Sequence, residues 1–174
     1  MHFKLKGAPV ISLVGFMGCG KSTIGGLLAA RLGWRFVDLD EEIERRSGAP
    51  IARIFESEGE PRFRQLEHEA LLEQLQVARQ GRGRVLALGG GAFANPQNRD
   101  LMENDGVSIW LDCALERLWQ RVAAASHRPL AQNHEQFERL YRERLPHYRG
   151  ADFVVVCDTE PPDEVVEKIL SLLG

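Results

Sequence analysis

The chain has 174 residues, of which 44% are hydrophobic and 27% are charged. These values are typical of soluble globular proteins, and the length fits one compact domain over residues 1–174, so fibrous, disordered and multidomain architectures are excluded. The net charge of −3 provides no general attraction to nucleic acid or to an anionic membrane, and we expect neither as a partner.

The amino-terminal segment carries an uncharged run over residues 7–20 that follows a pair of lysines, as the core of a signal peptide would. The run contains glycines, lacks a small-x-small cleavage site and is shorter than the ~20 apolar residues of a membrane span. We therefore expect an unprocessed, cytoplasmic protein. The cysteines at positions 19, 113 and 157 are far apart, and this spacing predicts neither a disulfide framework nor a zinc site.

Short apolar runs rich in β-branched residues alternate with longer segments of helical period, which is the pattern of βαβ units in an α/β fold with a parallel sheet. In chain order the runs predict strands at residues 10–14, 35–38, 85–88, 107–111 and 153–157. Each run is short and apolar throughout, as expected for a sheet covered on both faces.

Helices are predicted between and after these strands, at residues 21–32, 41–47, 50–78, 96–104, 114–125, 135–145 and 162–173. Gly59 and Pro61 are expected to divide the third helix. The polar segment 126–134 contains Arg128 and lies between two helices, so we interpret it as a lid over a binding site. Histidines 68, 127, 134 and 147 lie on polar or helical stretches and are interpreted as surface residues without a metal role.

The segment GFMGCGKS, residues 15–22, matches the pattern G-x-x-x-x-G-K-[ST] and lies between a predicted strand and a predicted helix. In this phosphate-binding loop, backbone amides and the helix N-terminus hold the β-phosphate, Lys21 reaches the β and γ oxygens and Ser22 holds Mg²⁺. A flexible glycine turn is the alternative, but it does not explain the strand and helix context. Cys19 lies among the loop amides, and we expect a lowered thiol pKa and raised reactivity there.

Two acidic residues, Asp38 and Asp40, lie at the C-terminal end of the second predicted strand. A spacing of two on an extended chain points both carboxylates to one side, toward the crevice where open α/β sheets bind ligands. One carboxylate can hold Mg²⁺ through water, and the other can accept a proton from an attacking hydroxyl. As an alternative, Asp40 could be the N-cap of the next helix.

Three consecutive glycines, Gly89, Gly90 and Gly91, end the third strand, where they would let a ligand approach the backbone closely. The fourth strand ends in Asp112 and resembles a Walker B motif. We interpret Asp112 instead as a capping or first-turn charge of the following helix.

Arginines on helices are usually solvated, but the placement of two is informative. Arg64 lies near the start of a helical segment with Glu67 three positions later, which can hold the guanidinium for a bidentate contact with a substrate carboxylate. Arg128, in the predicted lid, could reach the transferring phosphate as an arginine finger.

The order of these motifs over residues 10–173 resembles that of the shikimate kinases, a family of small P-loop kinases related to the nucleoside monophosphate kinases. The likeness also includes an Arg128-Pro-Leu segment and an Arg144-x-Pro-x-Tyr148 segment. The resemblance implies a three-layer αβα sandwich with strand order 2-3-1-4-5, a substrate-binding helical region at about residues 39–68 and a lid at about 126–134. It also implies ATP-dependent phosphorylation of the 3-hydroxyl of shikimate, a step toward chorismate and the aromatic amino acids, and we expect a monomer.

The resemblance also implies residue roles. Asp40 would hold substrate hydroxyls, as a base or by positioning them, Arg121 would lie near the adenine, and Glu67 would orient Arg64. The implied catalytic residues are Lys21, Asp40 and Arg128, and the implied Mg²⁺ ligands are Ser22 and Asp38. The implied ATP-binding residues are Gly15, Gly18, Cys19, Gly20, Lys21, Ser22, Thr23, Arg121 and Arg128. The implied shikimate-binding residues are Asp40, Arg64, Gly89, Gly90, Gly91 and Arg144.

Other functions remain to be weighed. A gluconate or nucleotide kinase would share the phosphate-binding loop, but paired arginines favour a small acid as the acceptor. A GTPase is excluded because no N-K-x-D motif occurs and the only lysine after the loop is Lys168. A module that binds ATP without turnover would be expected to lose the acceptor-side residues, which are present here.

Overall fold

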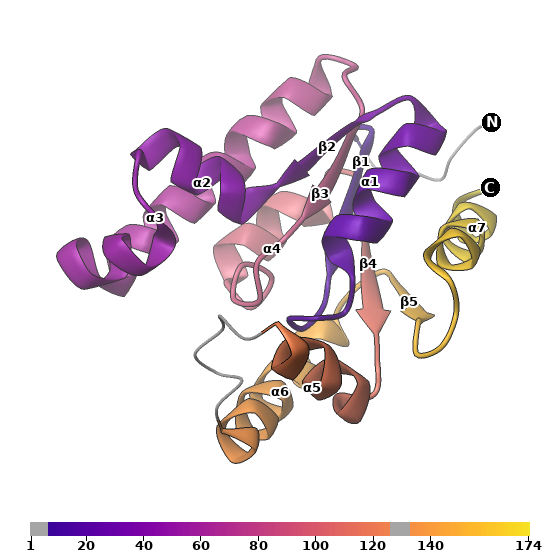
Figure 1. Cartoon of the computed structure of the whole chain (residues 1–174). Coiled ribbons are helices and arrows are strands. Elements are labelled where there is room, and N and C mark those ends of the chain that lie inside the picture. The colour runs from indigo at the N-terminus through magenta and orange to yellow at the C-terminus, as the bar shows by residue number, and fades with distance from the viewer. Residues whose placement is uncertain (1–6, 126–132) are drawn as a thin grey trace.

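The computed structural model describes residues 7–125 and 133–174. Within these ranges the strands are β1 (Val10–Val14), β2 (Arg35–Asp38), β3 (Arg84–Ala87), β4 (Val107–Asp112) and β5 (Phe153–Val156). They form one parallel sheet in the order β2-β3-β1-β4-β5 (Figure 1). The predicted strands and their order are confirmed, with ends that differ from the prediction by one residue in β3, β4 and β5.

The helices are α1 (Lys21–Leu32), α2 (Leu39–Ser47), α3 (Ile51–Arg79), α4 (Pro96–Glu103), α5 (Leu115–Ala124), α6 (His134–Tyr148) and α7 (Pro162–Leu173). Helices α1 and α7 contact each other and pack on the sheet, while α3 and α4 pack together, and α4 also contacts β4 (Figure 1). The sheet therefore lies between helical layers, as predicted. No helix in the described part of the chain is long and apolar enough to cross a membrane.

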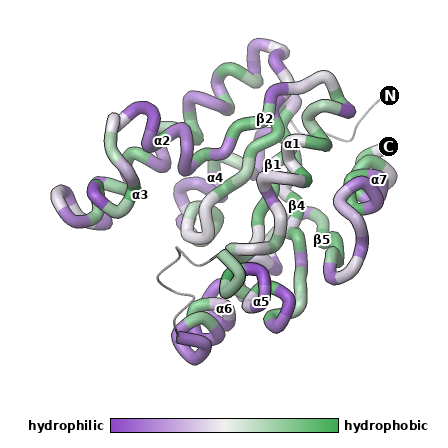
Figure 2. Tube along the Cα trace, viewed as in Figure 1, coloured by the Kyte–Doolittle hydropathy of each residue, from purple (hydrophilic) through white to green (hydrophobic). Residues whose placement is uncertain are grey.

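The centre of the sheet is the apolar core. Every residue of β1 and of β3 is buried, which is why these strands appear in the sequence as mostly apolar runs, with Ser12 and Arg84 as the polar exceptions. Figure 2 shows hydrophobic residues along the central strands and hydrophilic ones on the outer helices. The edge strand β5 differs, because Val154 and Val156 are 48% and 50% exposed.

The long helix α3 is divided as the sequence predicted. Gly59 has φ 81° and ψ 171°, which is not a helical conformation and is one that glycine adopts more easily than other residues. Pro61 lies in the turn that follows. The rings of Phe55 and Phe63 pack across this kink with centroids 4.8 Å apart. With α2, the first segment of α3 forms an arm that extends beyond the sheet (Figure 1).

The interpretation of Asp112 as a helix cap is wrong. Helix α5 has Ala114 as its N-cap and receives no capping bond from Asp112. Instead, Asp158, which follows β5, accepts a hydrogen bond from the Ala114 backbone nitrogen at 2.5 Å. Asp158 thus caps the helix in the role that the local sequence suggested for Asp112. Burial raises the pKa of Asp112, and the nearby charge of Asp158 raises it further.

Candidate active site

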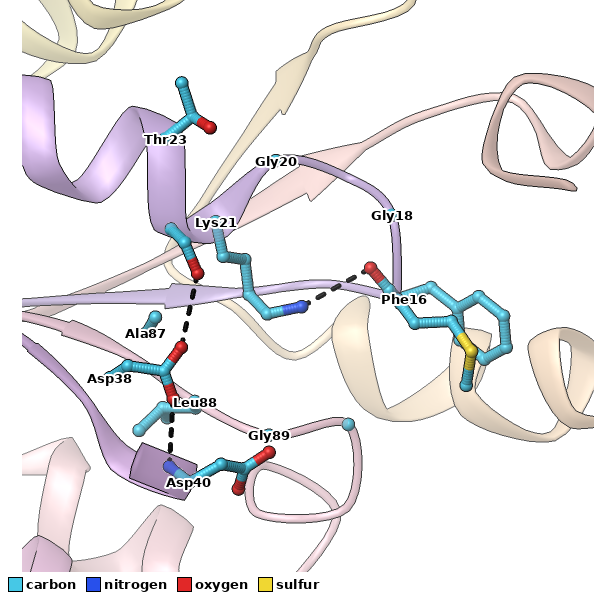
Figure 3. A pocket seen from close by; sticks show the side chains of 13 residues that line it. Phe16, Gly18, Gly20, Lys21, Thr23, Asp38, Asp40, Ala87, Leu88 and Gly89 are labelled. Carbon is cyan, nitrogen blue, oxygen red and sulfur yellow. Dashed lines mark hydrogen bonds between the residues drawn. The ribbon is translucent and has the colours of Figure 1, made fainter. Parts of the chain in front are cut away.

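A cavity of about 570 Å³ opens at the carboxyl ends of β1, β2 and β3 (Figure 3). Parallel strands place their ligand sites at this edge of the sheet. The cavity brings together three segments that lie far apart in the chain: the phosphate-binding loop, the start of α2 and the glycines after β3. Its lining residues are Phe16, Met17, Gly18, Gly20, Lys21, Ser22, Thr23, Asp38, Asp40, Ala87, Leu88, Gly89 and Gly90.

The loop between β1 and α1 has the backbone of an anion site. Gly20 is the N-cap of α1, with φ 95°, and makes no side-chain capping bond. At Gly15 an added Cβ would lie 2.9 Å from the Leu111 carbonyl oxygen, so the loop packs tightly on the end of β4. A helix N-terminus with uncapped amides attracts a phosphate through its hydrogen-bond donors and its dipole.

The Lys21 ammonium is folded over this loop. Its Nζ donates to the carbonyl oxygens of Gly15 at 2.7 Å and Phe16 at 3.3 Å, the latter drawn in Figure 3. These bonds keep the positive charge on the cavity wall beside the uncapped end of α1. Thr23 follows on the same first turn and also lines the cavity.

Asp38 and Asp40 both face the cavity, but the expected reason is wrong. Helix α2 begins at Leu39, so Asp40 lies on a helix. The two carboxylates therefore do not share one side of an extended strand. Asp38, not Asp40, is the N-cap: its Oδ1 accepts from the backbone nitrogens of Asp40 at 3.0 Å and Glu41 at 3.3 Å. The alternative role suggested for Asp40 therefore belongs to its neighbour.

Ser22 and Asp38 form the oxygen-rich corner of the cavity. Ser22 Oγ donates to Asp38 Oδ2 at 3.2 Å (Figure 3). A hydroxyl and a carboxylate are ligands of the kind that Mg²⁺ prefers, and Mg²⁺ at phosphate sites is usually held by one or two protein oxygens together with waters and phosphates. The absence of a cluster of three or more His, Cys, Asp or Glu ligands among the described residues is compatible with such a site.

The Asp40 carboxylate lies against the glycines after β3. A Cβ on Gly89 would lie 2.7 Å from Asp40 Oδ1, so only glycine permits this approach. Burial raises the pKa of Asp40, and the charges of Asp38 and Glu44 raise it further, against the opposing effect of Lys21 and Arg64. A carboxylate whose pKa is raised in a cleft is a stronger proton acceptor than an ordinary one.

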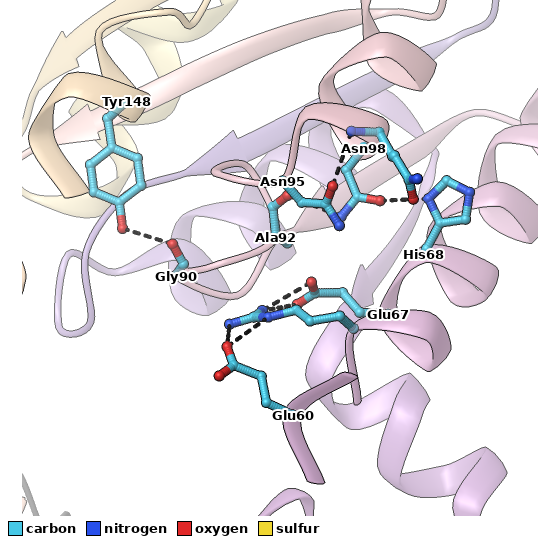
Figure 4. Close-up of polar contacts among 10 residues, drawn as sticks. Glu60, Glu67, His68, Gly90, Ala92, Asn95, Asn98 and Tyr148 are labelled. Atoms are coloured by element: carbon cyan, nitrogen blue, oxygen red, sulfur yellow. Dashed lines mark hydrogen bonds and ion pairs between the residues drawn. The ribbon is translucent and has the colours of Figure 1, made fainter. Parts of the chain in front are cut away.

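Arg64 lies on the other side of the same glycines, and its predicted ion pair is present. Its Nη1 donates to both oxygens of Glu67, at 3.0 and 3.1 Å, and Glu60 Oε1 lies 3.4 Å from its Nη2 (Figure 4). Glu67 is 1% exposed, so it holds the guanidinium from inside the protein. A Cβ on Gly91 would clash with that guanidinium. The sequence did not single out Glu60.

Helix α6 brings Arg144 and Tyr148 to this region. The ring of Phe16, in the phosphate-binding loop, packs edge-to-face on Phe137 and Tyr141 of α6, with centroids 5.0 and 5.5 Å away. Arg144, further along the helix, is close enough for its charge to lower the pKa of Glu67, although burial raises that pKa overall. The residues lining the cavity of about 570 Å³ do not include Arg64, Gly91 or Arg144.

Tyr148 and Asn98 donate hydrogen bonds to the backbone of residues 90–92, which follow β3 (Figure 4). The Tyr148 hydroxyl donates to the Gly90 carbonyl oxygen at 3.4 Å, and Asn98 Nδ2 donates to the Ala92 carbonyl oxygen at 3.0 Å. His68 Nδ1 lies 2.8 Å from Asn98 Oδ1, so His68 is not the surface residue we expected. The sequence marked Tyr148 only as part of the Arg144-x-Pro-x-Tyr148 segment and did not mark Asn98, because the partners of both residues lie on other elements.

Arg121 lies on the opposite side of the phosphate-binding loop. Its Nη1 donates to the Gly18 carbonyl oxygen at 3.0 Å. It lines a second cavity of about 310 Å³, together with the loop residues Gly18 and Gly20 and with Cys157. Arg128 and most of the predicted lid lie outside the described residues.

The expectation for Cys19 is wrong. Its side chain is 1% exposed, and burial raises the thiol pKa by more than the Lys21 ammonium lowers it. The side chain is directed into the protein against Gly15, where an added Cβ would lie 2.8 Å from Cys19 Sγ. Position in a phosphate-binding loop does not by itself activate a thiol when the thiol is buried.

Comparisons with known proteins agree with the resemblance seen in the sequence. The family model described as "Shikimate kinase" matches residues 17–174. The shikimate kinase of Sulfurihydrogenibium sp. is 41% identical over 162 residues, covering 92% of this chain and 95% of that protein. The shikimate kinase of Microcystis aeruginosa is 41% identical over 173 residues, covering 97% and 88%.

Among solved structures, the shikimate kinase of Acinetobacter baumannii in complex with shikimate superimposes with a TM-score of 0.85 at 37% identity, covering 96% of this chain and 93% of that one. The enzyme of Bacteroides thetaiotaomicron gives a TM-score of 0.85 at 29% identity, covering 94% and 97%. These likenesses extend over nearly the whole chain and include the elements that build the cavity. The chain belongs to the shikimate kinase family.

Proposed function

We propose that this protein transfers the γ-phosphoryl group of ATP to the 3-hydroxyl of shikimate, forming shikimate 3-phosphate in the biosynthesis of aromatic amino acids. The observation that carries the proposal is the single cavity in which the phosphate-binding loop faces Asp40 and the glycines beside Arg64. One wall suits a phosphoryl donor, and the other suits a small hydroxylated acid. The family membership supports the same reaction.

The donor side rests on the loop and on Lys21. We propose that the backbone amides from Gly15 to Thr23, with Cys19 contributing only its backbone, bind the β- and γ-phosphates. Lys21 would leave the loop carbonyls and stabilise the charge that spreads over the phosphoryl oxygens in the transition state. Arg121, anchored on the Gly18 carbonyl, would then lie beside the adenine.

Ser22 and Asp38 would hold the Mg²⁺ that accompanies ATP. The metal ion, when bound, neutralises phosphate charge and helps to orient the transferred group. The Ser22 to Asp38 hydrogen bond of 3.2 Å already places both oxygens at one corner of the cavity. Because Asp38 also caps α2, the metal corner and the start of the helix that carries Asp40 are joined.

The acceptor side rests on Asp40 and the arginines. Asp40 would receive the hydrogen bond of the reacting hydroxyl, and its raised pKa suits it to accept the proton as the phosphoryl group transfers. Arg64 would grip the shikimate carboxylate with the two-pronged geometry of a guanidinium, and Arg144 would add a second positive charge. Gly89, Gly90 and Gly91 would let the ring of the substrate lie close to the backbone.

The remaining proposals concern residues or properties beyond this geometry. We propose that Arg128, in a lid at about residues 126–134, acts as an arginine finger in the chemical step. We also propose that the helical region at about residues 39–68 binds the substrate. The enzyme would act as a cytoplasmic monomer of one domain, with ATP and shikimate as its partners and neither nucleic acid nor membrane. Sedimentation of the purified protein at increasing concentration tests the monomer.

Release of ADP in the presence and absence of shikimate tests the function. We expect turnover that requires shikimate and Mg²⁺, and no turnover with gluconate or a nucleoside monophosphate as acceptor. Lys21→Ala should nearly abolish this turnover, by at least about 100-fold, because it removes charge stabilisation from the transition state. Arg31→Ala is the matched control, since Arg31 lies in the last turn of the same helix, is 52% exposed and pairs with Glu167 on the surface. ADP release independent of shikimate would contradict the proposal.

A further inference from the structure

Two cysteines face each other at the carboxyl ends of β4 and β5. The parallel register pairs Asp112 with Val156, so the next residues of the two strands, Cys113 and Cys157, lie side by side (Figure 1 shows the two strands). Their sulfur atoms are 2.9 Å apart. Neighbouring strands are about 4.7–4.9 Å apart, which falls within the Cα separations that disulfides span. The pair can therefore be joined with little movement of the backbone.

The pair also contacts the phosphate-binding loop. The Cys113 and Cys157 sulfurs lie 3.7 and 3.9 Å from the Cys19 carbonyl oxygen, and they lie closer still to the carbonyl oxygens of Cys157 and Asp112, at 3.4 and 3.7 Å. Arg121 Nη1, which donates to the Gly18 carbonyl, lies 3.9 Å from Cys113 Sγ. The Cys19 carbonyl group thus contacts both thiols directly, and the Gly18 carbonyl group is linked to Cys113 through Arg121.

Both thiols are buried, at 2% and 3% exposure, but one cavity reaches Cys157, and the Cys113 sulfur lies 2.9 Å behind the Cys157 sulfur. Cys157 and Arg121 line the cavity of about 310 Å³ on the outer side of the phosphate-binding loop. A cavity of this size admits a molecule slightly larger than water, since one water needs only roughly 10–15 Å³.

We propose that Cys113 and Cys157 form a reversible disulfide when a hydroperoxide enters this cavity, and that the disulfide weakens ATP binding. The regulatory half of this inference rests on the proposed function, because it assumes that the loop binds ATP. The linkage itself does not depend on that function.

The chemistry assigns different roles to the two sulfurs. The hydrogen bond with Cys157 and the charge of Arg121 hold the pKa of Cys113 below its usual value, while the same bond and burial raise the pKa of Cys157. The Cys113 thiolate therefore attacks one oxygen of the peroxide, the O–O bond breaks, and Cys113 becomes a sulfenic acid. The Cys157 sulfur then attacks the Cys113 sulfur, and the displaced hydroxide leaves as water with the thiol proton. With hydrogen peroxide, two thiols are oxidised to one disulfide and the peroxide is reduced to two waters.

The disulfide changes what the loop contacts. In the disulfide neither sulfur carries a proton that could be donated to a carbonyl oxygen, and Cys113 can no longer ionise beside Arg121. The loop and the arginine that flanks it lose these restraints together. Since weak hydrogen bonds of this kind contribute modestly, we expect the dissociation constant for ATP to rise about 2- to 10-fold.

The linkage is tested on the reduced full-length protein with hydrogen peroxide. We expect an intact-mass loss of about 2 Da, because two hydrogens leave, and a peptide map that joins Cys113 to Cys157 and that a thiol reductant separates. A map that joins Cys19 to either partner, sulfinic acid without a cross-link, or no modification at excess peroxide overturns the proposal. Saturating ADP should slow the reaction, because the nucleotide would cover Arg121.

The effect on ATP is tested by calorimetric titration of the reduced, oxidised and re-reduced protein. We expect weaker ATP binding only in the oxidised form, full recovery on reduction, and an unchanged dissociation constant for shikimate. Cys157→Ser keeps a hydroxyl donor but cannot form the linkage, so its ATP affinity should be the same before and after peroxide. Cys113→Ala should behave in the same way, which provides a second variant if the first does not fold.

The outcomes separate the two proposals. A cross-linked protein whose ATP affinity equals that of the reduced protein overturns the regulation and leaves the proposed function intact. Loss of ATP affinity in Cys157→Ser on the same peroxide treatment also overturns it, since the effect would not come from the disulfide. If peroxide forms the cross-link but the reduced protein does not phosphorylate shikimate, the proposed function is contradicted and the linkage between Cys113 and Cys157 is supported.

Discussion

Asp38 and Asp40 are two positions apart in the sequence, yet the structure gives their carboxylates different environments. Asp38 accepts two backbone hydrogen bonds at the start of α2 and one from Ser22, so its charge is stabilised by donors. Asp40 lies in the first turn of α2, against the glycines after β3, and burial raises its pKa. Asp38, whose oxygens are fixed beside the Ser22 hydroxyl, suits a metal ligand, and Asp40, whose pKa is raised by burial, suits a base.

Asp40→Asn should therefore lower kcat and raise stability at neutral pH. Loss of a general base reduces turnover by about 10²- to 10⁴-fold. The pKa of Asp40 is raised on folding, so the folded state binds its proton more tightly than the unfolded state, and this carboxyl makes the wild type less stable as pH rises through its titration. Thermal unfolding should show a higher Tm for the variant at pH 7, with the difference disappearing below about pH 3, where the carboxyl is protonated in both states. Equal Tm values at pH 7 would contradict this.

In the wild type the same group should shape the pH profile of the reaction. The base must be ionised, so kcat/KM for shikimate should fall as pH is lowered through the raised pKa of Asp40, at a pH above the usual carboxyl range. The Asn variant should lack this limb. A profile of the wild type that stays flat down to the range of an ordinary carboxyl would argue against Asp40 as the base.

Arg64→Ala should mainly weaken shikimate binding. It removes a charge-assisted, two-pronged contact of about 1.5–3 kcal/mol, or about 10- to 150-fold in affinity, and ATP binding should barely change. Arg62→Ala is a matched control, because Arg62 lies two residues earlier, is 40% exposed and pairs with Glu58 on the surface. Isothermal titration of both variants with shikimate and ATP provides the comparison. Equal losses of ATP and shikimate affinity in Arg64→Ala would show that the residue is structural.

At the scale of elements, α1 shows how packing decides whether a glycine is needed. Gly25 and Gly26 are neighbours in this helix, and both have ordinary helical backbone. A Cβ on Gly25 would clash with the ring of Phe36 on β2 and lie 3.3 Å from Leu13 Cδ1, whereas a Cβ on Gly26 would meet nothing within 4 Å. The helix therefore contacts the sheet through the glycine at position 25.

Gly25→Ala and Gly26→Ala should change stability in opposite directions. Overpacking at position 25 should cost about 1–3 kcal/mol, because the half-buried ring of Phe36, which packs against the core, would have to be displaced. At position 26 alanine should stabilise by about 0.5–1 kcal/mol, because it restricts the unfolded chain and favours the helix. Urea unfolding of both variants measures the two effects. A destabilised Gly26→Ala would show that the space beside it is not open.

At the scale of the whole molecule, the site joins segments from most of the chain. The metal corner comes from α1 and β2, the acceptor side from α2, α3 and the segment after β3, and its supports from α4 and α6. Ligands that bind such a site bind the folded state and not the unfolded chain. Their binding should therefore stabilise the whole protein.

ADP with Mg²⁺ should raise the free energy of unfolding by about 2.7 kcal/mol at a concentration 100 times its dissociation constant. Removal of Mg²⁺ with a chelator should reduce this gain, because Ser22 and Asp38 would no longer share a metal with the phosphates. Thermal unfolding with ADP, with and without the chelator, measures the difference. In Asp38→Asn the chelator should have little further effect. An identical Tm shift with and without Mg²⁺ would contradict the proposed metal ligands.

The sequence by itself determined the parts of this protein whose cause is local. Apolar runs predicted the five strands because a parallel sheet is buried on both faces. Residues 15–22 identified the phosphate-binding loop because its geometry needs glycines at a strand end and a lysine at a helix start. Gly59 marked the break in α3, and the spacing of Arg64 and Glu67 predicted their ion pair, since residues three apart on a helix are neighbours.

Only the tertiary structure decided which side chains meet across elements. Asp38 took the capping role suggested for Asp40, and Asp158 took the one suggested for Asp112, because a cap depends on which oxygen reaches the amide in space. Cys19 is buried, and Cys113 meets Cys157 across 44 residues of chain, because strand order and register set these distances. Local patterns carry no information about such contacts, since their energy comes from partners brought together by the folded sheet.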